Sequence, residues 1–278
     1  TSGNGDTWTH QNVARKSLDK NIGGAAPDFE AALKWAISED KLAKKTDSMG
    51  STWLACAAKA AAEDRVARLL TEAREELDDR DGLTLWPSVH EIEGLSEHQR
   101  NELANATTGL ISVFAGAPGT GKTYCSAAMI KLIIEQYGED KVGITAPTGK
   151  AAVRVTEAMQ RNGIDMKAVT IHTLLKVEAS GGDEGFSFSF GRDFPLPHQF
   201  VIIDESSMID TTLMASLLAA RGKGTHYLFV GDTNQLAPVG HGAPLRDMIA
   251  AGIPAGTLTE IQRNSGRIVR ACAEIRNH

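Results

Sequence analysis

Short apolar runs alternate with helical patterns from about residue 95 onward. The apolar runs are LISVF (110–114), KVGIT (141–145), QFVII (199–203) and HYLFV (226–230). Helical patterns begin near Lys122, Gly149, Asp210 and Ala243. Because apolar strands separated by helices are typical of a parallel sheet covered on both faces, the pattern predicts an α/β fold. Ligands of such sheets bind beyond the carboxyl ends of the strands.

The first 93 residues show a different pattern, with apolar positions near helical spacing among many Ala, Lys and Glu. The clearest stretches are AALKWAISEDKLAKK (31–45) and WLACAAKAAAEDRVARLLTEAREEL (53–77). We therefore expect a small helical domain over residues 1–93 and an α/β domain over residues 94–278. All four tryptophans lie in the first region, where they either anchor packing or stack on bases.

The loop GAPGTGKT, residues 116–123, follows an apolar run and precedes a helical pattern. It matches G-x-x-x-x-G-K-[ST], in which backbone amides and a helix N-terminus bind phosphate. In this pattern Lys122 reaches the β- and γ-phosphates and Thr123 binds Mg²⁺, so ATP and Mg²⁺ are the expected cofactors. The expected nucleotide contacts in this loop are Gly116, Ala117, Pro118, Gly119, Thr120, Gly121, Lys122, Thr123 and Tyr124.

Two acids follow the apolar run at 199–203, in the sequence VIIDES (201–206). With a phosphate loop upstream, Asp204 is the expected Mg²⁺ ligand and Glu205 the general base that activates water. The other interpretation is a pair of acids favoured by a helix N-terminus.

A polar loop, GDTNQLAPVG (231–240), follows the run HYLFV. Turn chemistry explains Asp232, Pro238 and Gly240, but it does not explain Gln235. The amide of Gln235 can donate to a γ-phosphate oxygen and accept from the attacking water, so we expect it to sense the terminal phosphate.

Five motifs occur in the order found in helicases: GAPGTGKT, TAPTGKAA (145–152), TIHTLL (170–175), VIIDESSMID (201–210) and GDTNQLAPVGHG (231–242). Together they resemble the RecD-like branch of superfamily 1, DNA helicases that move 5′→3′. The resemblance covers about residues 95–278. It implies a RecA-like P-loop lobe that hydrolyses ATP to move on single-stranded DNA.

The resemblance also assigns roles to single residues. Gln99 in LSEHQ (95–99) resembles an adenine-recognising glutamine, although Ser96 and Gln99 also form a helix capping box. Arg263 in LTEIQRNSG (258–266) resembles an arginine finger, with a surface arginine as the alternative. The implied DNA contacts are Pro147, Thr148, Lys150, His172 and Thr173.

The segment 177–197 holds alternating Phe and Ser, FSFSF, between glycines. This period of two predicts a β-hairpin. It resembles the hairpin that RecD-like helicases insert at this place, which acts either as a pin at the duplex fork or as a plain edge hairpin.

Composition restricts the partners. The net charge is −6, split as 12 basic and 17 acidic residues in 1–93 and 17 and 18 in 94–278. Because no polybasic tract occurs, we expect any DNA contact to be local. Three separated cysteines favour a reducing compartment without structural zinc, and no apolar run reaches membrane-spanning length. We therefore expect a cytoplasmic protein.

The resemblance implies a second RecA-like lobe, which we do not expect within these 278 residues. We expect the chain to be the N-terminal part of a longer protein, with little unwinding activity alone. A second interpretation stays open, in which ATP switches contact with a protein partner through residues 1–93. Stimulation of ATP hydrolysis by single-stranded DNA would separate the two.

Overall fold

A six-stranded parallel sheet forms the centre of the computed structural model, which describes residues 7–22, 28–78, 85–179 and 186–261. The strand order is β11-β4-β10-β9-β5-β6. The strands are β4 (Ile111–Gly116), β5 (Val142–Ala146), β6 (Val169–Thr170), β9 (Phe200–Ile203), β10 (His226–Gly231) and β11 (Ala255–Leu258). The four apolar runs identified in the sequence are therefore confirmed as strands of one parallel sheet.

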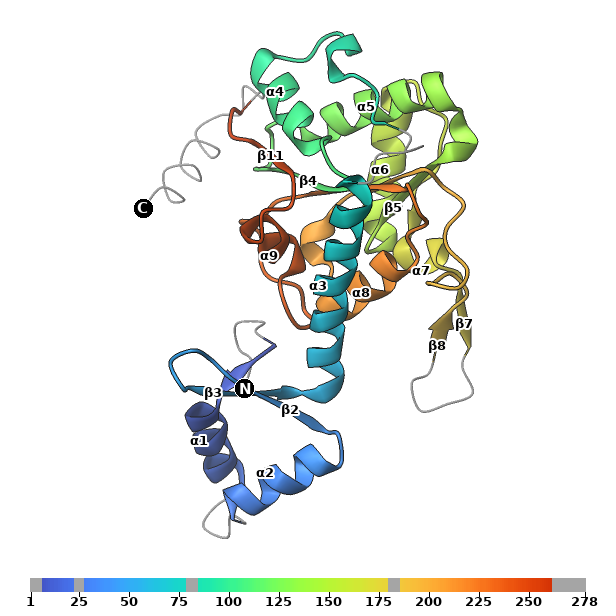
Figure 1. Cartoon of the computed structure of the whole chain (residues 1–278). Helices are drawn as coiled ribbons and strands as arrows, with labels where there is room; N and C mark the ends of the chain where they lie inside the picture. The colour runs from blue at the N-terminus through green and yellow to red at the C-terminus, as the bar shows by residue number, and fades with distance from the viewer. Residues whose placement is uncertain (1–6, 23–27, 79–84, 180–185, 262–278) are drawn as a thin grey trace.

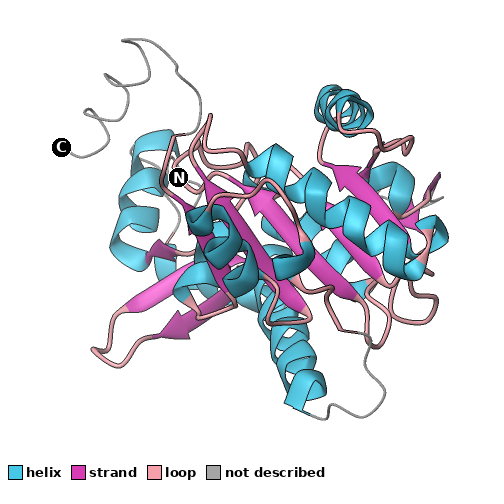
Figure 2. Ribbon diagram, turned by 90° about the horizontal axis from the view of Figure 1, so that it is seen from above, coloured by secondary structure: helices cyan, strands magenta, loops and turns pink. Residues whose placement is uncertain are grey.

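Helices cover both faces of this sheet (Figure 2). They are α4 (Glu97–Ala106), α5 (Lys122–Tyr137), α6 (Gly149–Arg161), α7 (Ile171–Leu174), α8 (Thr211–Ala219) and α9 (Pro244–Ala250). Three short 3-10 turns are η1 (Val89–Glu91), η2 (Glu139–Lys141) and η3 (Ser206–Met208). The expected helix starts at Lys122 and Gly149 are confirmed, and Asp210 and Ala243 are the N-cap residues of α8 and α9.

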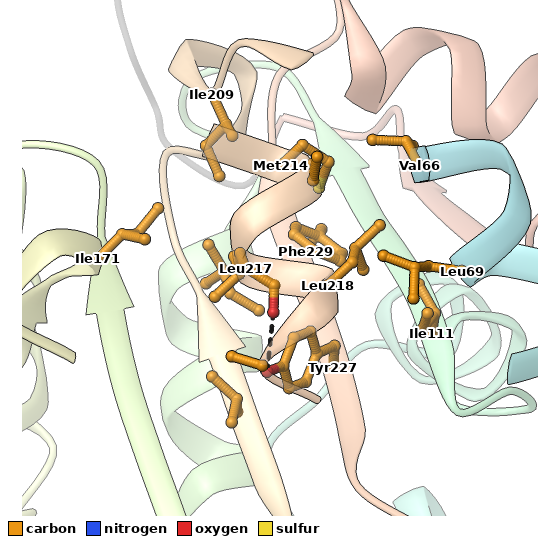
Figure 3. Packing of buried hydrophobic residues seen from close by; sticks show 14 of the residues in the cluster. Val66, Leu69, Ile111, Ile171, Ile209, Met214, Leu217, Leu218, Tyr227 and Phe229 are labelled. Atoms are coloured by element: carbon orange, nitrogen blue, oxygen red, sulfur yellow. Dashed lines mark hydrogen bonds between the residues drawn. The ribbon is translucent and has the colours of Figure 1, made fainter. Parts of the chain in front are cut away.

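Alternate residues of the strands supply two separate cores. Tyr227 and Phe229 of β10 point into the cluster under α8, whereas Leu228 and Val230 point into the cluster under α5. This alternation arises because successive side chains of a strand point to opposite faces of the sheet. Since helices cover both faces, the residues that point to either face are apolar. Figure 3 shows the first cluster, where the Tyr227 hydroxyl donates to the carbonyl of Leu217 at 3.2 Å.

The N-terminal region contains a small antiparallel sheet as well as helices, so the prediction of a purely helical domain is wrong. Its elements are β1 (Thr9–His10), α1 (Gln11–Ile22), α2 (Phe29–Ser38), β2 (Leu42–Thr46), β3 (Thr52–Cys56) and α3 (Ala57–Asp78). Strand β3 lies between β1 and β2. The helical stretches expected at 31–45 and 53–77 each overlap a strand.

A tight turn at residues 47–50 explains this difference. The Asp47 carboxylate accepts the backbone N–H groups of Met49 and Ser51 and the indole N–H of Trp53, each at 2.9 Å. Gly50 adopts a left-handed φ of 80°. The turn folds β2 back on β3, and this pairing overrides the helical propensity of the Ala- and Lys-rich residues beside it.

Helix α3 runs from the small sheet to the large one and packs along α8 (Figure 1). Its buried residues Val66, Leu69 and Ala73 belong to the same cluster as the strands. The α/β core thus takes in a helix that we assigned from the sequence to the region 1–93. Among the described residues, none of the helices is both long and apolar enough for a membrane span.

Candidate nucleotide and DNA site

The phosphate-loop sequence joins the end of β4 to the start of α5, as its pattern predicts. A Cβ on Gly116 would lie 2.8 Å from Thr120 Oγ1 and 2.9 Å from Leu258 Cβ, so only glycine fits there. Gly119 and Gly121 have left-handed φ values of 85° and 96°. The glycines therefore allow the tight backbone turn that a phosphate-binding loop requires.

The Lys122 ammonium lies over this loop. Its Nζ donates to the carbonyls of Gly116 at 2.6 Å and of Ala117 at 3.1 Å. The next residue, Thr123, is exposed in the first turn of α5. An ammonium and a hydroxyl are thus presented at one helix N-terminus, which favours anions.

The acid pair follows β9. The backbone N–H of Asp204 donates to the Thr145 carbonyl, and its Oδ1 accepts the N–H of Glu205 at 2.8 Å. Burial raises the pKa of Asp204 to about 6, and the charge of Glu205 adds to this effect. The positive charge of Lys122 acts in the opposite direction, so the phosphate-loop lysine is electrostatically coupled to this carboxyl.

Glu205 has an unusual backbone for a residue with a side chain. Its φ of 52° and ψ of 34° are left-handed. Such a conformation costs on the order of 1 kcal/mol, and residues that adopt it cluster at functional sites. Here it reverses the chain after β9 and leads it into the turn η3.

The Gln235 loop leaves the strand that lies between the other two. In the parallel register, Gly231 of β10 is level with Ala115 of β4, and Phe229 is level with Ile203 of β9. The three loops therefore start at one edge of three adjacent strands. The oxygens of Asp232 order the third loop by accepting the backbone N–H groups of Asn234 and Gln235.

A contact that the sequence did not lead us to expect joins two of these loops. The Ser207 hydroxyl donates to Gln235 Oε1 at 3.3 Å. The adjacent serines in VIIDESSMID were the available signal, because a hydroxyl next to the acid pair can hydrogen-bond and so position a neighbouring side chain.

Gln99 is buried, with 4% of its surface exposed. Its Oε1 accepts the N–H of Ser96 and its backbone N–H donates to Ser96 Oγ, so the capping-box interpretation is confirmed. Its Nε2 donates to the carbonyl of Thr120 at 3.3 Å. The glutamine therefore ties the start of α4 to the phosphate loop.

The residues expected to contact DNA lie at the neighbouring part of the same sheet edge. Strands β5 and β6 pair in parallel, with Ala146 level with Thr170. The loops after them carry Thr148, which accepts the N–H of Ala151 as the N-cap of α6, and the exposed Thr173. Pro147 is half-buried and Lys150 is exposed.

The predicted hairpin is confirmed in the segment 177–197. Strands β7 (Val177–Ala179) and β8 (Phe186–Phe188) are antiparallel, and the hairpin projects from the body of the domain (Figure 1). The His172 ring lies 5.7 Å from that of Phe188, so the base of the hairpin borders the expected DNA residues. Arg263 lies outside the described residues.

A comparison with protein-family models matches the AAA domain over residues 94–278. The chain belongs to this AAA-domain family. Its curated relatives include the RecBCD enzyme subunit RecD of Mycobacterium tuberculosis, 38% identical over 169 residues. That match covers 55% of this chain and 28% of the relative.

Another relative of this AAA-domain chain is the ATP-dependent RecD2 DNA helicase of Deinococcus radiodurans, 40% identical over 174 residues. The match covers 63% of this chain and 22% of that protein, so the chain spans less than a third of both relatives. The described part of the matched region has a RecA-like α/β fold, and its sequence is similar to those of RecD and RecD2. Among solved structures, the Pif1 helicase from Candida albicans aligns with 66% of this chain and 44% of its own, at 23% identity and a TM-score of 0.46.

Proposed function

We propose that this chain carries the ATP-hydrolysing lobe of a DNA helicase of the RecD-like type, which moves on single-stranded DNA. The observation that supports this most is the convergence of three loops at one edge of three adjacent parallel strands. These loops carry Lys122, the pair Asp204 and Glu205, and Gln235. A cation, two acids and an amide at one sheet edge are the groups that phosphoryl transfer to water requires.

The proposed nucleotide site has Lys122 binding the β- and γ-phosphates over a glycine-rich cradle. Because the ammonium donates to the carbonyls of Gly116 and Ala117, binding exchanges at least one of these bonds for a phosphate oxygen. The oxygens of Thr123 and Asp204 fit Mg²⁺, which prefers hard oxygen ligands. When bound, Mg²⁺ supplies positive charge against the terminal phosphates.

For hydrolysis, we assign Glu205 to accept the proton of the attacking water. Gln235 donates to a γ-phosphate oxygen, and Arg263 supplies further positive charge from the segment that precedes the end of the chain. Gln99 is assigned to the adenine edge, which requires its amide to exchange its present bond to Thr120 or to Ser96. These roles apply to a site that is completed by a second RecA-like lobe.

For DNA, we assign the backbone contacts to Thr148, Lys150, His172 and Thr173, with Pro147 shaping the loop. The N-termini of α6 and α7 lie at this place, and helix N-termini attract phosphate. Residues 1–93 are assigned to contact with a protein partner or with the remaining part of the helicase, because their net charge of −5 opposes DNA binding.

The test of this proposal is Glu205→Gln in the full chain. We expect ATP hydrolysis to fall about 10²- to 10⁴-fold, with ATP affinity unchanged within about threefold, because only the proton acceptor is removed. Hydrolysis is measured by phosphate release with and without single-stranded DNA, and affinity by calorimetry. Hydrolysis that survives the substitution would contradict the assigned base.

A matched control is Glu157→Gln, which makes the same change on an exposed helix surface. It should leave both hydrolysis and affinity unchanged. Absence of stimulation by single-stranded DNA in a protein that includes both lobes would favour the switch interpretation instead.

A further inference from the structure

Two adjacent serines follow the acid pair and reach the neighbouring strand and its loop. Ser206 Oγ donates to the Val230 carbonyl at 2.8 Å, and Ser207 Oγ donates to Gln235 Oε1 at 3.3 Å. Both serines are buried, whereas Gln235 is exposed. The first hydroxyl therefore fixes backbone, and the second reaches a side chain at the surface.

The turn that carries these serines is held in place by contacts that do not involve the Ser207 side chain. The left-handed backbone of Glu205 directs η3 toward the end of β10. A Cβ on Gly231 would lie 2.9 Å from Ser206 Oγ and 3.1 Å from Ser207 N, so the contact is closer than a side chain allows. Backbone packing and the Ser206 bond thus set the position of Ser207.

The Gln235 side chain has little else to fix it. It borders a hollow of about 60 Å³, which Ser207 and Asp232 also line, instead of a packed core. Within the described residues, the hydroxyl of Ser207 is the hydrogen-bond partner of its amide. A long side chain with free rotation loses conformational entropy when a ligand orders it, so prior orientation improves binding.

The direction of this hydrogen bond determines which end of the Gln235 amide faces a ligand. Because Oε1 accepts the Ser207 proton, Nε2 is the end that remains for the nucleotide. Nε2 is a donor, and phosphate oxygens are acceptors. The contact therefore favours donation to a terminal phosphate over acceptance of a hydrogen bond from the attacking water.

We propose that Ser207 is the positioning residue of the Gln235 sensor and couples it to the acid loop. The inference rests on the proposed role of Gln235. Since Ser207 is two residues from Glu205, a shift of the acid loop is transmitted to the amide through one hydrogen bond. The hydrogen bond between Ser207 and Gln235 makes the affinity for a triphosphate depend on the position of the acid loop.

The experiment measures the affinities of the full chain for ADP and for adenylyl-imidodiphosphate, a non-hydrolysable ATP analogue, in the presence of Mg²⁺. Ser207→Ala should weaken binding of the analogue by about 3- to 10-fold, the effect of one hydrogen bond, and change ADP affinity by less than about twofold. Ser207→Thr keeps the hydroxyl. It should restore the wild-type ratio of the affinity for the analogue to the affinity for ADP.

A double-mutant cycle with Gln235→Ala tests the coupling. Ser207→Ala should have no further effect on the ratio once Gln235 is truncated. The control is Ser216→Ala, which removes a hydroxyl that donates to the Thr212 carbonyl within α8 and should leave the ratio unchanged.

The outcomes separate the inference from the proposed function. If Gln235→Ala lowers the ratio but Ser207→Ala does not, the positioning role is wrong and the sensor stands. If Ser207→Ala weakens the binding of ADP and of the analogue equally, the residue is only structural and the inference fails. If Gln235→Ala leaves the ratio unchanged, the sensor itself fails, and the inference with it.

Discussion

At the residue scale, the Asp204 carboxyl links function to stability. Burial, with the Glu205 charge, raises its pKa from 3.8 to about 6 in the folded protein. The folded state therefore holds this proton more tightly than the unfolded state. Its contribution to stability is complete below about pH 4 and is lost as the pH rises to about 6. Two pKa units correspond to about 3 kcal/mol, which partial exposure of the residue reduces to about 2 kcal/mol.

Asp204→Asn should consequently stabilise the fold at neutral pH while abolishing hydrolysis. We expect the free energy of unfolding to increase by about 2 kcal/mol at pH 7.5 and to change by less than about 0.5 kcal/mol at pH 4, because the wild-type carboxyl is then neutral. The side-chain oxygen of Asn still accepts the N–H of Glu205. Urea unfolding at the two pH values measures the effect.

The control for this prediction is Asp165→Asn, on an exposed residue outside the site. It should change the free energy of unfolding by less than about 0.5 kcal/mol at either pH. Equal effects of Asp204→Asn at pH 4 and pH 7.5 would contradict the raised pKa.

Single residues were predictable from sequence where a motif fixes the backbone. The glycines of the phosphate loop and the ordering role of Asp232 could be predicted because turn geometry dictates them. Gln99 had two possible roles, since an amide can bond either a helix N-terminus or a base. The contact between Ser207 and Gln235 spans 28 positions and depends on strand order, which local sequence does not encode.

At the element scale, the N-terminus of α6 offers a test of the DNA surface. The oxygen of Thr148 accepts the N–H of Ala151, so its hydroxyl proton can still be donated to a DNA phosphate. Thr148→Asp keeps a good N-cap but adds a negative charge. We expect it to weaken binding of single-stranded DNA by at least about 10-fold in the protein that includes both lobes, with Tm unchanged within about 2 °C. Fluorescence anisotropy and thermal unfolding provide the two readouts.

The matched variant Thr148→Ser keeps both the cap and the donor. It should bind DNA within about twofold of the wild type. If Thr148→Asp binds DNA normally at low salt, the loop after β5 does not contact the phosphate backbone.

Four strands of the large sheet (β4, β5, β9 and β10) could be predicted because buried parallel strands are continuous apolar runs. Strands β2 and β3 could not be predicted, since Ala and Lys in β2 favour a helix and β3 leads directly into the Ala-rich start of α3. Their pairing depends on the Asp47 turn. Strand β6 is only two residues long, which is too short for a periodic signal. Short elements are fixed by their neighbours in the sheet instead of by their own composition.

At the scale of the whole molecule, a buried ion pair fastens α3 to the sheet domain. Arg221 and Glu76 retain 8% and 13% side-chain exposure, and Glu76 also accepts the N–H of Gly224. Glu76→Ala should lower the free energy of unfolding by about 3 kcal/mol, because it leaves the guanidinium charge buried without its partner. Chemical denaturation measures the loss.

Glu157→Ala is the comparison, because it breaks an exposed pair with Arg161. It should change the free energy of unfolding by less than about 1 kcal/mol. A small effect of Glu76→Ala would mean that α3 is fastened by apolar packing alone.

Helix α3 also sets the distance and the relative rotation between the small N-terminal sheet and the six-stranded sheet. It runs unbroken for 22 residues, with β3 attached at one end and Glu76 bonded near the other. One inserted residue would move one sheet by about 1.5 Å and rotate it by about 100° relative to the other. Related chains that keep this arrangement should vary in the identity of the exposed α3 residues but conserve the length of the helix, and they should accommodate insertions in the turn 47–50.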